Sequence, residues 1–182
     1  MSTARATKSV FWPIILLCGT SAQAGPVPWG YQKVAGAYGV PSDILYAIAL
    51  TESNHKLKNG TYRPWPWTLN VQRRPERFAT RKAAYDALRR YLRQGIKQID
   101  VGLMQVNWRY HRKKLGSPWA ALEPYHNLRV GTAILRAEYA QTNNWHTAIG
   151  RYHAPNNSRR AKQYRRRVEK HLRRIRGGKQ RK

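Results

Sequence analysis

Residues 40–54 read VPSDILYAIALTESN and predict an amphipathic helix that carries an acid near its end. Ser42 is a preferred N-cap residue, and Asp43 lies in the first turn, where a negative charge interacts favourably with the helix dipole. The spacing i, i+3, i+4, i+7 then places four residues on one helix face: Leu45, Ile48, Ala49 and Glu52. A carboxyl group is therefore expected on the apolar face of its own helix.

Two interpretations of Glu52 follow from this placement. Burial disfavours the ionised form and raises the pKa of a carboxyl group, which suits a general acid that works near neutral pH. Alternatively, Glu52 lies just past the core at a frayed helix end, and its carboxylate faces solvent. Helix geometry alone favours the second interpretation, because strongly perturbed acids are uncommon. Motifs later in the chain favour the first.

The first 24 residues are typical of a secretory signal peptide. Arg5 and Lys8 precede an apolar segment over residues 10–18, and the sequence AQA at residues 22–24 fits cleavage after Ala24. The apolar segment is too short to span a bilayer as an anchor. Cleavage would remove two cations from a chain of net charge +27, leaving +25, together with the only cysteine. We therefore expect a periplasmic protein without disulfides.

The remaining chain predicts a mainly α fold of the α+β type. The 182 residues suit one compact domain with extensions, and no fixed-period repeat is visible. Helices are expected over residues 31–38, from Thr80 to Gly95, from an N-cap at Asn127 to about Ala140, and over residues 147–152. Alternation over residues 67–71 and 96–101 predicts a small β-ribbon near the active-site cleft.

Two tryptophans of the turn-rich segment before this ribbon have alternative roles. Trp65 and Trp67 either stack against sugar rings or cap the core, since Trp is highly buried on average.

Three segments carry the chemistry of the chain. They are Glu52-Ser53, the run DVGLMQVN at residues 100–107, and AIGRY at residues 148–152. In content and order they resemble the catalytic domain of lytic transglycosylases, lysozyme-like enzymes that cut the glycan strands of peptidoglycan. The resemblance covers roughly residues 31–155. The Asp before GLMQVN and the PWPW insertion at residues 64–67 look most like enzymes that accompany conjugative or type IV secretion machines.

The resemblance implies roles for the residues of these motifs. Glu52 would be the acid/base catalyst of cleavage between N-acetylmuramic acid and N-acetylglucosamine, with Ser53 as a polar support. Gly102 would allow close backbone approach to the substrate, and Tyr152 would orient Glu52. Met104, Gln105 and Asn107 would belong to the sugar site. The family often follows this Tyr with Asn-Ala-Gly, whereas here the sequence continues with residues 153–155, HAP.

The inventory of acids can be checked without the resemblance. Ordinary glycosidases use two carboxylates, but of eight acids only Glu52 and Asp100 lie in motifs; Glu138 is expected to form an internal ion pair. One-carboxylate cleavage, in which the substrate's own C6 hydroxyl closes a 1,6-anhydro ring, is implied by the resemblance. Asp100 keeps lysozyme-type hydrolysis open as an alternative, although such an Asp more often caps a turn.

We expect no metal and no other cofactor, because the histidines are scattered.

Residues 25–157 are interpreted as the catalytic domain and residues 158–182 as a basic C-terminal helix and tail. The last segment contains 13 Lys or Arg and one acid. Helical spacing predicts that one stripe packs on the domain, with Gly177-Gly178 ending the helix; the stripe comprises Ala161, Tyr164, Val168, Leu172 and Ile175.

The basic surface of this segment suggests several partners. Besides the glycan strands, we expect attraction to the anionic cell envelope or to acidic proteins of a secretion complex. Nucleic acid is not the expected partner, because a basic patch has no base-reading content. A non-catalytic adaptor that binds the wall or DNA through this surface is the alternative from another functional class.

Overall fold

The computed structural model describes residues 27–179, so the predicted signal peptide lies outside the described residues. The elements in chain order are α1 (Trp29–Ala37), α2 (Ser42–Ser53), β1 (Asn54–Lys56), β2 (Tyr62–Pro64), β3 (Thr68–Val71), β4 (Arg74–Arg77), α3 (Arg81–Arg93), β5 (Ile99–Val101), β6 (Val106–Asn107), α4 (Trp108–Leu115), α5 (Pro118–Ala121), α6 (Pro124–Thr142), α7 (Trp145–His153) and α8 (Ser158–Lys179). The predicted mainly α, α+β fold is confirmed.

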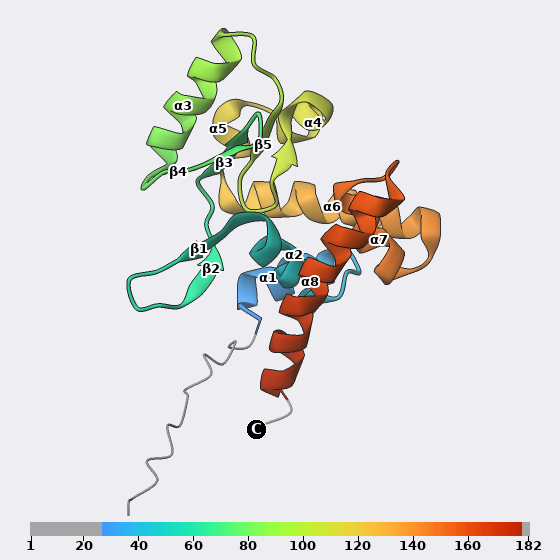
Figure 1. Cartoon of the computed structure of the whole chain (residues 1–182). Coiled ribbons are helices and arrows are strands. Elements are labelled where there is room, and N and C mark those ends of the chain that lie inside the picture. Colours follow the sequence, from blue (N-terminus) through green and yellow to red (C-terminus); the bar gives the residue numbers. More distant parts are fainter. Residues whose placement is uncertain (1–26, 180–182) are drawn as a thin grey trace, which may run out of the picture.

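The helices form two groups joined by α6 (Figure 1). Helices α1, α2, α7 and α8 pack together at one end, and α3, α4 and α5 lie with the larger sheet at the other. Helix α6 contacts α1 and α7 in the first group and α4, α5 and β6 in the second. Ser53, the last residue of α2, is hydrogen-bonded to Leu103 between β5 and β6, so this end of α2 contacts the second group.

The larger sheet has strand order β4-β3-β5-β6, and all of its pairings are antiparallel. Alternation along β3 and β5 turns Leu69, Val71, Ile99 and Val101 into the core. The intervening positions, Asn70 and Asp100, are half-buried on the opposite face. A second, two-stranded sheet pairs β1 with β2 directly after α2.

Helix α2 is buried on several sides. Leu45, Ile48 and Ala49 have no exposed surface, as the helical spacing predicts. The helix begins at Ser42, and Pro41 occupies the N-cap position without a side-chain cap, one residue earlier than predicted. Because α2 is one continuous helix, the burial of Leu45, Ile48 and Ala49 in the core also determines where Glu52 lies in its last turn.

Two helix boundaries differ from the predictions. Asn127 does not cap a helix: the N-cap of α6 is Glu123, four residues earlier, which accepts hydrogen bonds from the first turn, and the helix begins at Pro124. Gly177-Gly178 does not end α8, which continues to Lys179. A glycine within a helix lowers helix stability by only about 1 kcal/mol relative to alanine. The apolar burial of the stripe that precedes Gly177 offsets this loss.

The tryptophans before the sheet are used in packing. The Trp65 indole N–H donates to the Phe78 carbonyl at 2.7 Å, and Trp67 packs against the core. The predicted ion pair of Glu138 is present, because Arg151 Nε lies 2.6 Å from its carboxylate and links α6 to α7.

Within residues 27–179 no single helix is long and apolar enough to span a membrane; α1 and α2 would qualify only as a pair bent by 117°.

Candidate active site

Glu52 lies in the last turn of α2, beside α8 and the β5–β6 hairpin. The residue is half-buried, but its carboxyl group is removed from water far enough that desolvation raises the pKa to about 7, from an ordinary value of 4.5. This net value includes smaller effects of three neighbours: Tyr164 and Arg167 lower the pKa of Glu52, and the nearby Asp100 carboxylate raises it. The interpretation of Glu52 as a solvent-facing acid at a frayed helix end is therefore wrong.

The β5–β6 hairpin presents residues 102–105, the GLMQ motif, next to the end of α2. The turn requires glycine at its first position, because Gly102 has φ +81°. A Cβ at this residue would also lie 2.5 Å from the side chain of Asn127. The absence of a Cβ at Gly102 thus accommodates a protein side chain, and the predicted approach of the substrate to this backbone stays a prediction.

Asn127 holds the motif turn from within α6. Its amide oxygen accepts from the Met104 N–H at 2.9 Å, and its amide nitrogen donates to the carbonyls of Val101 (2.8 Å) and Ala121 (3.1 Å). The residue is 1% exposed, so these bonds satisfy a buried amide that would otherwise destabilise the fold. The sequence signal, a polar residue at the start of a helical pattern, indicated a cap instead.

The side chain of Met104 does not line a sugar site. It is fully buried and packs so tightly against Gly131 of α6 that a Cβ on that glycine would lie 2.5 Å away. Met104 therefore anchors the turn in the core, and the prediction of a substrate-lining side chain is wrong.

Ser53 and Tyr152 also stabilise the turn. The buried Ser53 hydroxyl donates to the Leu103 carbonyl at 2.8 Å and lies 3.2 Å from the Ala49 carbonyl, which links α2 to the motif. The Tyr152 hydroxyl donates to the Met104 carbonyl at 2.7 Å. Tyr152 was predicted to orient Glu52, but a hydroxyl has one proton to donate, so Tyr152 has none left for the Glu52 carboxylate.

Gln105 closes the turn in a left-handed conformation, with φ +45°. Its amide nitrogen donates to the carbonyls of Gly102 (2.9 Å) and Thr68 (3.2 Å). Within residues 27–179 its amide oxygen has no hydrogen-bond donor, and the side chain is half-buried. This oxygen therefore remains able to accept a further hydrogen bond.

A row of polar side chains crosses the sheet on the face that carries Asp100. Asn70, Asp100 and Asn107 are directly paired across β3, β5 and β6. The amide of Asn107 donates to one carboxylate oxygen of Asp100 at 2.7 Å, and the amide of Asn70 donates to the other at 3.2 Å. Desolvation raises the pKa of Asp100, and these two hydrogen bonds lower it.

The position of Asp100 corrects the simpler interpretation of this residue. It lies inside a strand and forms no turn cap, while the neighbouring Asn107 caps α4 by accepting from the Arg109 N–H. Asp100 is also close enough to Glu52 for its charge to raise the pKa of that acid. The structure thus brings together the two acids of the motifs.

Helix α8 contributes residues that the motifs do not contain. Tyr164 is 1% exposed, and its hydroxyl is close enough to the Glu52 carboxyl to interact with it, although the two form no hydrogen bond of regular geometry. Arg167, one helical turn later, adds a positive charge near Glu52. In the sequence Tyr164 had only the pattern of a packing residue.

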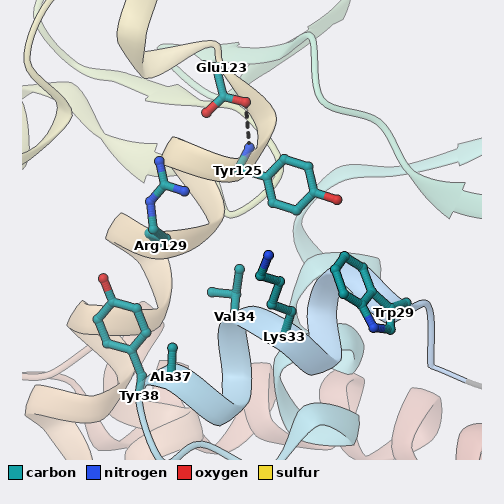
Figure 2. Close-up of a pocket in the computed structure, with 8 residues that line it drawn as sticks. All are labelled: Trp29, Lys33, Val34, Ala37, Tyr38, Glu123, Tyr125 and Arg129. Atoms are coloured by element: carbon teal, nitrogen blue, oxygen red, sulfur yellow. Dashed lines mark hydrogen bonds between the residues drawn. The ribbon is translucent and has the colours of Figure 1, made fainter.

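A cavity of about 540 Å³ lies away from these groups, between α1 and α6 (Figure 2). Trp29 and Lys33 line it from α1, and Tyr125 and Arg129 from α6. Its one acid, Glu123, is engaged as the cap of α6 through the Tyr125 N–H at 3.0 Å. Since the cavity contains no residue of the three motifs, we assign the chemistry to the Glu52 region.

Within residues 27–179 no three His, Cys, Asp or Glu side chains cluster as a metal site would require.

A buried acid with a raised pKa near a second acid in a polar, hydrogen-bonded environment is the arrangement of lysozyme-like glycan-cleaving enzymes. Residues 31–173 match the family model described as Transglycosylase SLT domain, and the chain belongs to this family of peptidoglycan lytic transglycosylases. Its substrates are peptidoglycan glycan strands. No curated protein and no solved structure gives a significant match. The family match extends past residue 157 into α8.

Proposed function

We propose that Glu52 is the single acid/base catalyst of this transglycosylase and that the product carries a 1,6-anhydromuramoyl end. The observation that carries the proposal is the environment of Glu52, whose pKa of about 7 keeps a proton available near neutral pH. An acid and a base are both needed during the reaction, and a group that titrates near the working pH can serve as each in turn.

The reaction balances without water. Protonated Glu52 donates its proton to the glycosidic oxygen, and the bond from C1 of N-acetylmuramic acid to that oxygen breaks. The resulting carboxylate then takes the proton of the C6 hydroxyl of the same sugar, and O6 bonds to C1. The internal nucleophile gains from proximity, and Glu52 ends in its starting, protonated form.

A second candidate activity is hydrolysis of the same bond, and the position of Asp100 favours it. In lysozyme-type cleavage an ionised carboxylate in a hydrogen-bonded environment stabilises the positive charge at C1 or attacks it, and water completes the reaction. Asp100 accepts hydrogen bonds from Asn70 and Asn107 and lies near Glu52.

Product analysis on purified sacculi separates these possibilities. We expect the wild-type protein to release anhydro-ended muropeptides and Glu52→Gln to release none, because the amide cannot donate and retake the proton. Asp86→Asn is a suitable control, because Asp86 pairs with Lys82 on the exposed face of α3. Full activity of Glu52→Gln would overturn the proposal. Products heavier by one water would establish hydrolysis, and absence of any wild-type product would favour the non-catalytic adaptor.

We also propose that the protein is periplasmic and opens the wall locally for a conjugation or secretion machine. The motivating features are the signal-peptide pattern of residues 1–24 and the Asp100 and PWPW variations of the motifs. Partners would be acidic proteins of such a complex and the anionic envelope surface. Cell fractionation that places the mature protein in the cytoplasm would exclude this role.

A further inference from the structure

We propose that the cavity between α1 and α6 is a second wall-binding site, which holds a muropeptide of peptidoglycan away from Glu52. A muropeptide combines sugars of the glycan strand with a short peptide that carries free carboxylates. The inference takes from the family only its substrate, the glycan strand, and does not depend on the proposed catalytic role of Glu52. Such a site would give the enzyme a contact with the wall outside its active site.

The cavity has the size of a small-ligand site. Its volume is about 540 Å³, and ligand pockets commonly measure about 300–1,000 Å³. Figure 2 shows that side chains of α1 and α6 line it from two sides, so the packing of these helices forms it. The groups around Glu52 belong instead to α2, α7, α8 and β5, so the two sites share no element.

Two exposed aromatic rings line the cavity. Trp29 is 66% exposed, although Trp is highly buried on average, and Tyr125 is 46% exposed. The Tyr125 ring lies against the start of α1, where a Cβ at Gly30 would be 2.9 Å from the tyrosine hydroxyl oxygen. Glycine in a helix is destabilising relative to alanine, but at this position it leaves room for the Tyr125 ring. The two rings offer apolar faces on which the C–H face of a sugar ring can pack.

Two cations line the same cavity without an acidic partner. Among residues 27–179, Lys33 and Arg129 form no ion pair. Lys33 Nζ lies 5.0 Å from the centre of the Trp29 ring, so a positive charge and an aromatic face are presented together. The carboxylate that lines the cavity, Glu123, accepts hydrogen bonds from the first turn of α6 instead. A ligand with free carboxylates would supply the negative charge that Lys33 and Arg129 lack.

The aromatic rings and the cations together determine the class of ligand. A neutral sugar would pack on the rings and leave the cations unpaired, whereas an acidic peptide alone would pair with the cations and leave the rings exposed. A muropeptide carries a sugar ring and carboxylates in one covalent unit. It is also part of the glycan strands on which the family acts, so the site requires no additional partner.

The test is an NMR titration of the isotopically labelled mature protein with the disaccharide N-acetylglucosaminyl-N-acetylmuramic acid that carries its stem peptide, at about 0.15 M NaCl. This probe lacks the bond from N-acetylmuramic acid to N-acetylglucosamine, so the proposed reaction does not consume it. We expect saturable shifts of the Trp29 indole N–H and the Tyr125 amide. Lys33→Gln/Arg129→Gln should weaken this binding by about tenfold, the effect of losing two exposed ion pairs.

Arg173→Gln/Arg174→Gln is the matched control, because it removes the same charge from exposed positions of α8 and should leave the affinity unchanged. Lys33 and Arg129 are exposed as well, so both double variants should keep the unfolding midpoint of the wild-type protein. The neutral disaccharide of N-acetylglucosamine and the free stem peptide should each bind more weakly than the muropeptide.

Three results would overturn the inference. The first is the absence of shifts at Trp29 and Tyr125, and the second is equal affinity of the two double variants. The third is a free peptide or a neutral disaccharide that binds as tightly as the muropeptide, since either the rings or the cations would then have no part in binding.

The titration is independent of turnover and therefore separates this inference from the proposed function. If Glu52→Gln is inactive on sacculi but the muropeptide does not bind at the cavity, only the second site is rejected. If the muropeptide binds at the cavity but Glu52→Gln retains full activity, only the proposed function fails.

Discussion

The environment of Glu52 opposes ionisation, and this has a consequence for folding. An acid whose pKa is higher in the folded than in the unfolded protein binds its proton more tightly in the folded state. Between pH 4.5 and about 7 the unfolded chain therefore ionises first, and stability falls as the pH rises. Below pH 4.5 Glu52 is protonated in both states and contributes no difference.

We predict that Glu52→Gln unfolds at higher denaturant concentration than the wild-type protein above pH 7. Glutamine has a similar shape and carries no charge to desolvate. The difference in free energy of unfolding should shrink as the pH falls from about 7 to 4.5 and should disappear below that range. Urea titrations of both proteins at each pH measure it, and the titrations of groups that do not interact with Glu52 cancel in the difference. A difference that does not change with pH would show that Glu52 is not buried.

Residue identities predicted the burial of the Glu52 carboxyl group better than they predicted the contacts of its neighbours. Gly102 and Asn127 depend on each other, because the amide of Asn127 occupies the space in which a Cβ of residue 102 would lie. They are 25 positions apart in the chain, and the sequence contains no sign of the contact. Spacing within one element reports its buried face, but pairing between distant elements depends on tertiary packing.

At the scale of elements, α8 is part of the core and not an appendage. Its stripe is buried in the same cluster as α2: Tyr164, Val168, Leu172 and Ile175. Helical spacing predicted these packing positions from the sequence. What spacing could not predict is that the stripe reaches Glu52, because this requires the packing of α8 against α2.

We predict that Leu172→Ala lowers the free energy of unfolding by roughly 2–5 kcal/mol, through lost apolar burial and the cavity left behind. Leu172 is 6% exposed, whereas its neighbour Arg173 is exposed. Arg173→Ala is the control and should change stability by less than about 0.5 kcal/mol. Urea unfolding measures both. Equal stability of Leu172→Ala and the wild-type protein would mean that α8 docks weakly.

Element boundaries were predictable where a local signal exists. Thr80 was predicted to cap α3, and its hydroxyl accepts from the Ala83 N–H at 3.2 Å. The start of α6 was placed wrongly because Asn127 has the appearance of a cap, although Pro124 at the first helical position was the better signal. An asparagine that bonds across elements and one that caps a helix cannot be told apart without the fold.

At the scale of the whole molecule, positive charge exceeds what the acids can neutralise. The chain has 35 Lys and Arg against 8 Asp and Glu, so most cations have no acidic partner. Among residues 27–179 the ion pairs involve only Asp43, Asp86, Glu138 and Glu169. A large net charge destabilises the compact state through self-repulsion but attracts anionic surfaces.

Salt should therefore act in opposite directions on folding and on wall binding. Raising NaCl from about 0.01 M to about 0.15 M shortens the screening length from about 30 Å to about 8 Å. Screening weakens repulsion among the cations, so we predict that the thermal unfolding midpoint rises. Over the same range the amount of protein that sediments with sacculi should fall, because attraction to their carboxylates is screened as well. Arg173→Gln/Arg174→Gln, which removes two exposed cations of α8, should reduce both slopes. Salt-independent sedimentation would mean that the active site and not the basic surface holds the protein on the wall.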